Sequence, residues 1–134
     1  MEYKVGKSLD SSKIERLYTD AGWYAYTKNV PLLMEAIENS LYVLTAWDED
    51  ELVGLVRVVG DGLTIIYIQD ILVLKAYQNK GIATELIQQV ERTFETVRQK
   101  VLLTEEAPDV RRFYEKNGFQ SCDKGTLVAF AKLT

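Results

Sequence analysis

The sequence predicts an α/β fold in which a mixed β-sheet is covered by helices. Apolar, β-branched runs are concentrated between about residues 41 and 74, and amphipathic segments with helical spacing precede and follow them. Turn residues separate these runs. The predicted order of elements is β-α-α-β-β-β-α-β-α-β, and the 134 residues fit a single domain, 1–134.

The first third of the chain predicts a short strand and two helices. The strand covers Tyr3–Val5. The first helix spans about residues 10–21, because Asp10 or Ser11 can cap it and apolar residues follow at helical spacing. The second helix begins near Pro31, a residue favoured in the first helical turn.

Three consecutive strands are predicted next. Leu41–Trp47 and Leu52–Val59 are joined by Asp48–Asp50 as a hairpin turn, and Gly60–Gly62 marks a second turn. Thr64–Leu74 is the longest strand candidate, and its nearly continuous apolar character predicts a central strand covered on both faces.

The remaining elements alternate. A long helix is predicted over about residues 81–97, followed by a short strand at Val101–Thr104. The next helix starts at Pro108 and ends at Asn117-Gly118, and Thr126–Lys132 is predicted as the last strand.

Composition excludes several chemistries. The chain contains no His, so neither a Ser-His-Asp nor a Cys-His pair can form, and zinc sites built on imidazole are excluded. The lone Cys122 cannot form an internal disulfide or a thiolate cluster, so no metal site is expected. Any general base must therefore be a carboxylate, a Tyr, a Lys or a water molecule.

Charge and hydropathy limit the classes of partner expected for this chain. The 16 Lys and Arg against 20 Asp and Glu give a net charge of −4, which argues against nucleic acid as a partner. No apolar run approaches the roughly 18 residues that span a bilayer, so no membrane partner is expected. Met1–Asp10 lacks the apolar core of a signal peptide, and a cytoplasmic location is expected.

A polar loop between the longest strand and the long helix predicts a phosphate site. The free N–H groups and the positive dipole end of a helix start bind anions. Gly81 has no Cβ and allows close approach, Gln78 and Asn79 offer amide donors, and Lys80 adds one charge. The alternative is an ordinary helix start that happens to contain a glycine.

Two segments resemble the GNAT acetyltransferases. Gln78–Ala83 is similar to the Q/R-x-x-G-x-G/A signature of that superfamily, and Phe113–Phe119 resembles a second, later motif. The resemblance covers nearly the whole chain in element order. It implies a central, mixed, splayed sheet of six to seven strands flanked by about four helices, with acetyl-CoA lying where the fourth and fifth strands part.

The resemblance also implies how the chain holds acetyl-CoA. The pyrophosphate is expected on backbone N–H groups from about Lys80 to Thr84, and the pantetheine arm along the backbone of Leu72 and Val73. The expected cofactor-binding residues are Leu72, Val73, Gln78, Asn79, Lys80, Gly81, Ile82, Ala83 and Thr84.

Tyr114 matches the position of the family's catalytic acid, which protonates the departing thiolate. The alternative is a core role, because Val110, Phe113 and Tyr114 share helical spacing. The chain departs from the family at Ala107-Pro108, where many relatives carry a cofactor-contacting Asn.

The catalytic base is left open by the sequence. Asp70 lies among apolar residues of the longest strand, where an unpaired charge is costly, and could accept the amine's proton directly or through water. Alternatively it pairs with Arg57 or caps a bulge. Asp61 is a second candidate, although Asp61-Gly62 also fits a simple turn, and water alone could suffice.

The connection between the first two helices is unusually aromatic. Trp23, Tyr24 and Tyr26 are predicted to form part of an acceptor pocket, because aromatic faces beside carboxylates suit an amine. Alternatively, Trp23 and Tyr26 cover the sheet edge and pin the first helix.

Together these features predict an N-acetyltransferase. It would move acetyl from acetyl-CoA to a primary amine of a small molecule, or to a protein amine, by direct attack in a ternary complex. A homodimer is consistent with the resemblance. Two other hypotheses stay open: a non-catalytic acyl-CoA sensor or protein-interaction module on the same fold, and a structural domain without a cofactor.

Overall fold

The computed structural model describes residues 1–134, which divide into two compact units, Met1–Leu103 and Thr104–Thr134. Each unit is described by itself. The prediction of a single domain over the whole chain stays a prediction.

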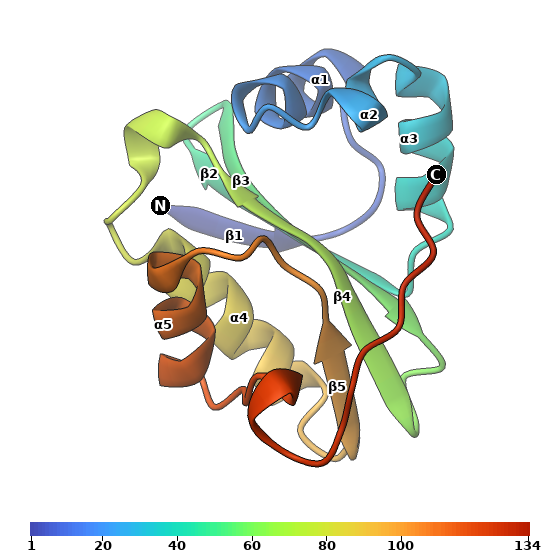
Figure 1. Cartoon of the computed structure of the whole chain (residues 1–134). Helices are drawn as coiled ribbons and strands as arrows, with labels where there is room; N and C mark the ends of the chain where they lie inside the picture. The colour runs from blue at the N-terminus through green and yellow to red at the C-terminus, as the bar shows by residue number, and fades with distance from the viewer. The chain divides into compact units, whose positions relative to one another are not determined.

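The first unit is built on a five-stranded sheet in the order β1-β2-β3-β4-β5 (Figure 1). The strands are β1 (Glu2–Val5), β2 (Tyr42–Asp48), β3 (Glu51–Gly60), β4 (Ile65–Val73) and β5 (Gln99–Leu102). The first four pair antiparallel to their neighbours, and β5 pairs parallel to β4. The predicted mixed α/β fold is confirmed.

Helices cover both faces of this sheet (Figure 1). On one side lie α1 (Ser11–Asp20), α2 (Tyr24–Thr27) and α3 (Val30–Glu38), of which α1 packs on β3 and β4. On the other side, α4 (Ile82–Thr93) packs on β2, β3 and β4. A short 3-10 turn, η1 (Lys75–Tyr77), connects β4 to the loop before α4.

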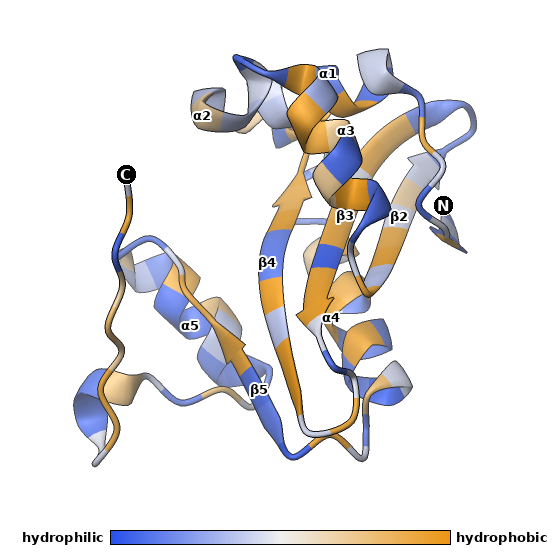
Figure 2. Cartoon of the chain, turned by 90° about the vertical axis from the view of Figure 1, so that its right-hand side faces the viewer, coloured by the Kyte–Doolittle hydropathy of each residue, from blue (hydrophilic) through white to orange (hydrophobic).

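The predicted strand Thr64–Leu74 corresponds to β4, which lies inside the sheet between β3 and β5 and is contacted by α1 and α4. The most completely buried strand, however, is β3. Every residue of β3 from Leu52 to Val58 is buried, whereas exposed and half-buried residues interrupt β4. Hydrophilic bands likewise interrupt the hydrophobic colour along β4 (Figure 2). The reason is sheet order: β3 has a full-length neighbour on each side, and β4 loses its β5 neighbour after Ile68.

Local capping explains where the predicted helices begin. The side chain of Asp10 accepts the N–H of Lys13 at the start of α1, as predicted. Asn29 caps α3 in the same way, one residue before the helix. Gly81 lies at the N-cap of α4 in the left-handed region, with φ +83°.

The second unit contains α5 (Pro108–Lys116), followed by a 3-10 turn, η2 (Cys122–Lys124). The predicted stop is confirmed: Gly118 has φ +89°. Its N–H bonds to the carbonyl of Glu115, and that of Phe119 bonds to the carbonyl of Tyr114. This is the paired bond pattern of a Schellman motif.

The predicted last strand, Thr126–Lys132, is wrong. This segment has no strand pairing, and Leu127, Val128 and Phe130 are at least 70% exposed. Its composition favours a strand locally, but a strand also needs a ladder of bonds to a partner. The sheet consequently has five strands instead of six to seven. None of the helices combines the length and the apolar character that crossing a bilayer requires.

Candidate functional site

The edge of β4 is open beyond Ile68, the last β4 residue that pairs with β5. Leu74 donates its N–H to the carbonyl of Val53 in a 2.8 Å bond. Because successive residues of a strand direct their backbone groups to opposite sides, Leu72 bonds toward β3, while Ile71 and Val73 face the open side. Of the two strand residues predicted to hold pantetheine, Val73 therefore directs its backbone groups to this edge, where its carbonyl accepts the side chain of Gln78.

A bulge in β4 lies where this strand separates from β5. Arg57 is opposite Asp70 and Val58 is opposite Ile68, so Gln69 is an extra residue on β4. A bulge bends its strand and increases the local twist. Gln69 directly follows the last residue paired with β5. The divergence of β4 from β5 thus has a local cause in the sheet itself.

The loop before α4 presents free N–H groups. The first backbone bond of the helix runs from Glu85 N–H to the carbonyl of Gly81, at 3.0 Å, and no side chain caps the helix. The N–H groups of Ile82–Thr84 therefore have no partner within the helix. A Cβ built on Gly81 would meet no atom within 4 Å, so the space around it is open. Glycine is required there for its positive φ.

The polar side chains of this loop differ in their contacts. Gln78 Nε2 donates to the carbonyl of Val73 at 3.3 Å, which ties the loop back to the open edge. Lys80 Nζ lies 5.4 Å from the centroid of the Tyr77 ring. Asn79 is exposed and has φ +62°, a left-handed conformation that Asn tolerates better than most residues.

Asp70 lies in a buried polar cluster. Its Oδ2 accepts bonds from Tyr18 Oη and Arg57 Nε, and its Oδ1 accepts one from Tyr26 Oη, all at 2.8 Å. Only 2% of Asp70 is exposed. The Arg57 partner that the sequence analysis considered is therefore present.

The charges of this cluster are fixed by its geometry. Burial, reinforced by the Asp70 carboxylate, raises the pKa values of Tyr18 and Tyr26. Burial acts to lower the pKa of Arg57, but the adjacent Asp70 carboxylate outweighs this and raises it. Both phenols thus stay neutral and Arg57 stays cationic at neutral pH.

Asp61, the second base candidate, lies in a turn. Its Oδ1 accepts the backbone N–H groups of Leu63, Thr64 and Ile65 at 2.8 to 3.0 Å. These bonds lower the pKa of Asp61. A carboxylate stabilised in this way is a weak base, and its contacts match the turn alternative.

Of the three aromatic residues in the connection after α1, Trp23 and Tyr26 come together and Tyr24 does not. The rings of Trp23 and Tyr26 pack on Tyr18 of α1, with centroid distances of 5.9 and 5.2 Å. This is the helix-pinning arrangement weighed from the sequence. Tyr24 is 65% exposed. Trp23 and Tyr26 are each half-buried, so part of both side chains remains accessible to a ligand.

Tyr114 lies in the second unit, on α5. Its ring makes edge-to-face contacts with Phe113 and Phe119, at centroid distances of 5.0 and 5.8 Å. Burial raises the pKa of Tyr114 to about 12. Nearby, Arg111 pairs with Glu106 and Asp123.

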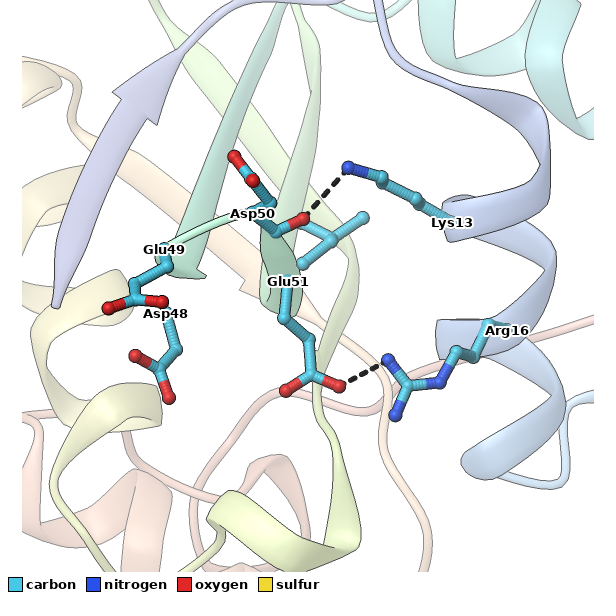
Figure 3. Close-up of a pocket in the computed structure, with 7 residues that line it drawn as sticks. Lys13, Arg16, Asp48, Glu49, Asp50 and Glu51 are labelled. Carbon is cyan, nitrogen blue, oxygen red and sulfur yellow. Dashed lines mark hydrogen bonds and ion pairs between the residues drawn. The ribbon is translucent and has the colours of Figure 1, made fainter.

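A charged pocket of about 520 Å³ lies elsewhere in the first unit, at the β2–β3 hairpin (Figure 3). Neither the loop before α4 nor Asp70 lines it. Its lining residues are Lys13, Arg16, Asp48, Glu49, Asp50, Glu51 and Leu52. No group of three or more His, Cys, Asp or Glu side chains is arranged to hold a metal ion.

Three hydrogen bonds to the loop were not predicted. Asp20 at the end of α1 accepts the backbone N–H of Lys75 at 2.8 Å. Tyr77 Oη lies 2.6 Å from a carboxylate oxygen of Asp48 and 3.0 Å from one of Glu51. The partners are separated by 26 to 55 residues, so no local pattern could have indicated these contacts.

The chain is similar to known proteins in sequence and in fold. A family model described as "Acetyltransferase (GNAT) domain" matches residues 9–133. An uncharacterised N-acetyltransferase, ycf52-like, from Prochlorococcus marinus is 28% identical over 130 residues, or 92% of this chain and 70% of that protein. The structure of a GNAT-family acetyltransferase from Streptococcus pneumoniae has a TM-score of 0.86 and 28% identity, covering 99% of this chain and 97% of that one.

The mixed sheet with helices on both faces is the fold that the Streptococcus pneumoniae acetyltransferase shares. The chain belongs to the GNAT acetyltransferase family, since the family model spans most of its length. It is accordingly an acyltransferase.

Proposed function

We propose that this protein transfers an acetyl group from acetyl-CoA to a primary amine, by direct attack within a ternary complex. The observation that carries the proposal is the continuity of two features in the first unit. The open backbone edge at Val73 leads through one short loop to the free N–H groups of Ile82–Thr84. The first suits an amide-containing arm, and the second suits a pyrophosphate.

Two fold neighbours support the choice of ligands. A PaiA N-acetyltransferase from Thermoplasma acidophilum, with a TM-score of 0.72 and 15% identity, was crystallised with coenzyme A. The structure of AAC(6')-Iy, with a TM-score of 0.71 and 15% identity, contains a bisubstrate analogue that joins CoA to acetylneamine. As part of the proposal, we assign to this chain an acyl-CoA as donor and a small-molecule amine as acceptor.

The loop residues would bind the donor with backbone groups. The N–H groups of Lys80–Thr84 would meet the pyrophosphate, and Lys80 would add one positive charge. Gln78 and Asn79 would hold the loop around it, and Val73 would pair with the pantetheine arm, with Leu72 as its neighbour. When bound, acetyl-CoA supplies the acyl group as a thioester.

We assign Tyr114 as the general acid because it matches the family's motif position. Its phenol stays protonated at neutral pH, since burial raises its pKa to about 12. As the amine nitrogen bonds to the acyl carbon and the C–S bond breaks, Tyr114 would give its proton to the departing sulfur. The amine's surplus proton would pass to water, from which the phenolate recovers a proton.

Water is the base that the geometry favours. The Asp70 carboxylate is buried and already accepts three bonds, and Asp61 is stabilised as a turn residue. Both carboxylates are already engaged as acceptors within the protein. The half-buried rings of Trp23 and Tyr26 are proposed to line the acceptor side, and the exposed Tyr24 would border it.

The test is a panel of amines assayed with acetyl-CoA by release of the free thiol. A diamine, an amino sugar, an arylalkylamine and an amino acid cover the main acceptor classes. Tyr114→Phe should lower kcat about 100-fold with little change in KM, because general acid catalysis contributes that much or more. The matched control is Tyr42→Phe, which also removes one tyrosine hydroxyl. Tyr42 lies on β2, and its ring packs on Phe94.

The pH dependence gives a second readout. A raised tyrosine pKa keeps the neutral form, so Tyr114 contributes fully to stability below about pH 10 and loses that contribution as pH rises through about 12. The rate should therefore rise from pH 7 to 9 as the amine becomes neutral, and should not fall from ionisation of Tyr114 in that range. Acetyl-CoA binding without turnover of any amine would favour the sensor alternative instead.

A further inference from the structure

The loop that connects β4 to α4 has no apolar anchor of its own. Leu74 before it and Ile82 after it are each 3% exposed. Between them, Tyr77 is half-buried and the other residues are exposed. Polar contacts must therefore fix the conformation of this loop.

Asp20 provides the first contact. Its carboxylate accepts the N–H of Lys75, the first residue of the loop, at 2.8 Å. Asp20 is the last residue of α1, a helix whose other face is buried on the sheet. The start of the loop is thereby tied to a rigid element.

Tyr77 provides the second contact. Its hydroxyl lies between the carboxylates of Asp48 and Glu51, at 2.6 and 3.0 Å, and can donate its single proton to one of them at a time. These bonds raise the pKa of Tyr77. Glu51 is held in turn by Arg16 of α1, at 2.5 Å (Figure 3). Bonds from Arg16 and Tyr77 lower the pKa of Glu51, so it stays ionised.

Because Tyr77 is held in place, the conformation of the residues that follow it is restricted. Its ring faces the Lys80 ammonium at 5.4 Å, which holds this cation near it. Asn79 and Gly81 both have left-handed φ angles, so the path between Tyr77 and α4 has few alternatives. Donors that are oriented before binding lose less entropy when an anion arrives.

We propose that Tyr77 and Asp20 are positioning residues for phosphate recognition. They hold the Lys75–Gly81 loop in the conformation that directs the free N–H groups of α4 at the pyrophosphate of an acyl-CoA. This inference rests on the proposed function and deepens it, because it identifies groups outside the signature loop that set donor affinity.

The test compares two donors that differ in the nucleotide half. Acetyl-CoA carries the pyrophosphate as part of its 3′-phosphoadenosine diphosphate, and S-acetylpantetheine lacks that whole group. Tyr77→Phe keeps the ring above Lys80 and removes the hydroxyl bonds. We expect it to raise the Kd for acetyl-CoA about tenfold, the loss of one hydrogen bond to a charged group, and to leave the Kd for S-acetylpantetheine unchanged.

Controls separate positioning from folding. Asp20→Ala, which leaves Tyr77 intact, should give the same donor-selective loss. Tyr42→Phe removes a tyrosine hydroxyl outside the loop and should change neither Kd. Faster hydrogen exchange at the amides of Ile82–Thr84 in Tyr77→Phe, with an unchanged melting temperature, would show the loosened loop directly.

Each contrary result has a distinct meaning. Equal weakening of both donors, or no weakening of acetyl-CoA, would overturn the positioning role and leave the proposed function standing. Failure of the wild-type protein to bind acetyl-CoA at all would contradict the proposed function, and the positioning role with it.

Discussion

At the scale of single residues, Asp70 shows how neighbours set the chemistry of a side chain. The sequence indicated that a carboxylate among apolar strand residues needs a partner, and it named Arg57 as one possibility. The structure supplies three donors, two of which are the phenols of Tyr18 and Tyr26. The cluster joins α1 and α2 to β3 and β4 through two buried bonds, from Tyr18 and Arg57, and one partly buried bond, from Tyr26.

Asp70→Asn should therefore act mainly on stability. It leaves the Arg57 charge buried without its counter-ion, which typically costs about 3 to 5 kcal/mol in the free energy of unfolding. Urea denaturation measures this loss, and adding Arg57→Met should recover much of it. If Asp70→Asn abolished turnover while the urea midpoint stayed unchanged, the carboxylate would instead be the catalytic base.

Residues of the site could be predicted where neighbouring residues in the sequence indicate their chemistry. The Gln78–Thr84 loop was identified because a glycine, amide side chains and a helix start adjoin in sequence. Tyr77 and Asp20 were missed because their partners are distant along the chain. Whether Tyr26 faces an acceptor or only pins α1 likewise depends on tertiary packing.

At the scale of elements, the start of α4 depends on a glycine in β3. A Cβ built on Gly54 would lie 3.2 Å from Ile82 Cγ2, 3.4 Å from Ala46 Cβ and 3.4 Å from the carbonyl oxygen of Leu72. Gly54 thus allows the first turn of α4 to approach the sheet closely, and Ile82 belongs to the proposed phosphate site.

Gly54→Ala should displace that turn by a few tenths of an ångström. We expect a loss of about 1 kcal/mol in the free energy of unfolding from overpacking, and a several-fold rise in the Kd for acetyl-CoA. Chemical denaturation and titration calorimetry measure the two effects. Gly125→Ala is the matched control, because a Cβ there meets nothing within 4 Å. Unchanged affinity in a destabilised Gly54→Ala protein would separate α4 packing from donor binding.

Elements were predicted well where periodicity and caps agreed. The starts of α1, α4 and α5 all lie within one residue of their expected positions. Thr126–Lys132 was mistaken for a strand because β-propensity is a local property and pairing is not. The more complete burial of β3 was missed for a related reason: sheet order determines how fully each apolar strand is covered.

At the scale of the whole molecule, the family match spans residues 9–133 and so includes both compact units. The fold class could be predicted because local sequence patterns indicate both the order of elements and the signature loop. It could not predict the number of paired strands, because that number depends on contacts between distant segments.

The most direct test of the central claim is a calorimetric titration of the whole protein with acetyl-CoA. Gly81→Ala and Gly118→Ala form a matched pair, since both glycines have left-handed φ angles, +83° and +89°, and open space where a Cβ would lie. Each substitution should cost about 1 to 2 kcal/mol in backbone strain. Only Gly81 lies at the start of α4.

We predict that the wild-type protein and Gly118→Ala bind acetyl-CoA with the same affinity, and that Gly81→Ala binds at least about tenfold more weakly. Equal affinity in all three proteins would remove the phosphate from this loop. The absence of any heat or thermal stabilisation with the wild-type protein would contradict acetyl-CoA as its donor.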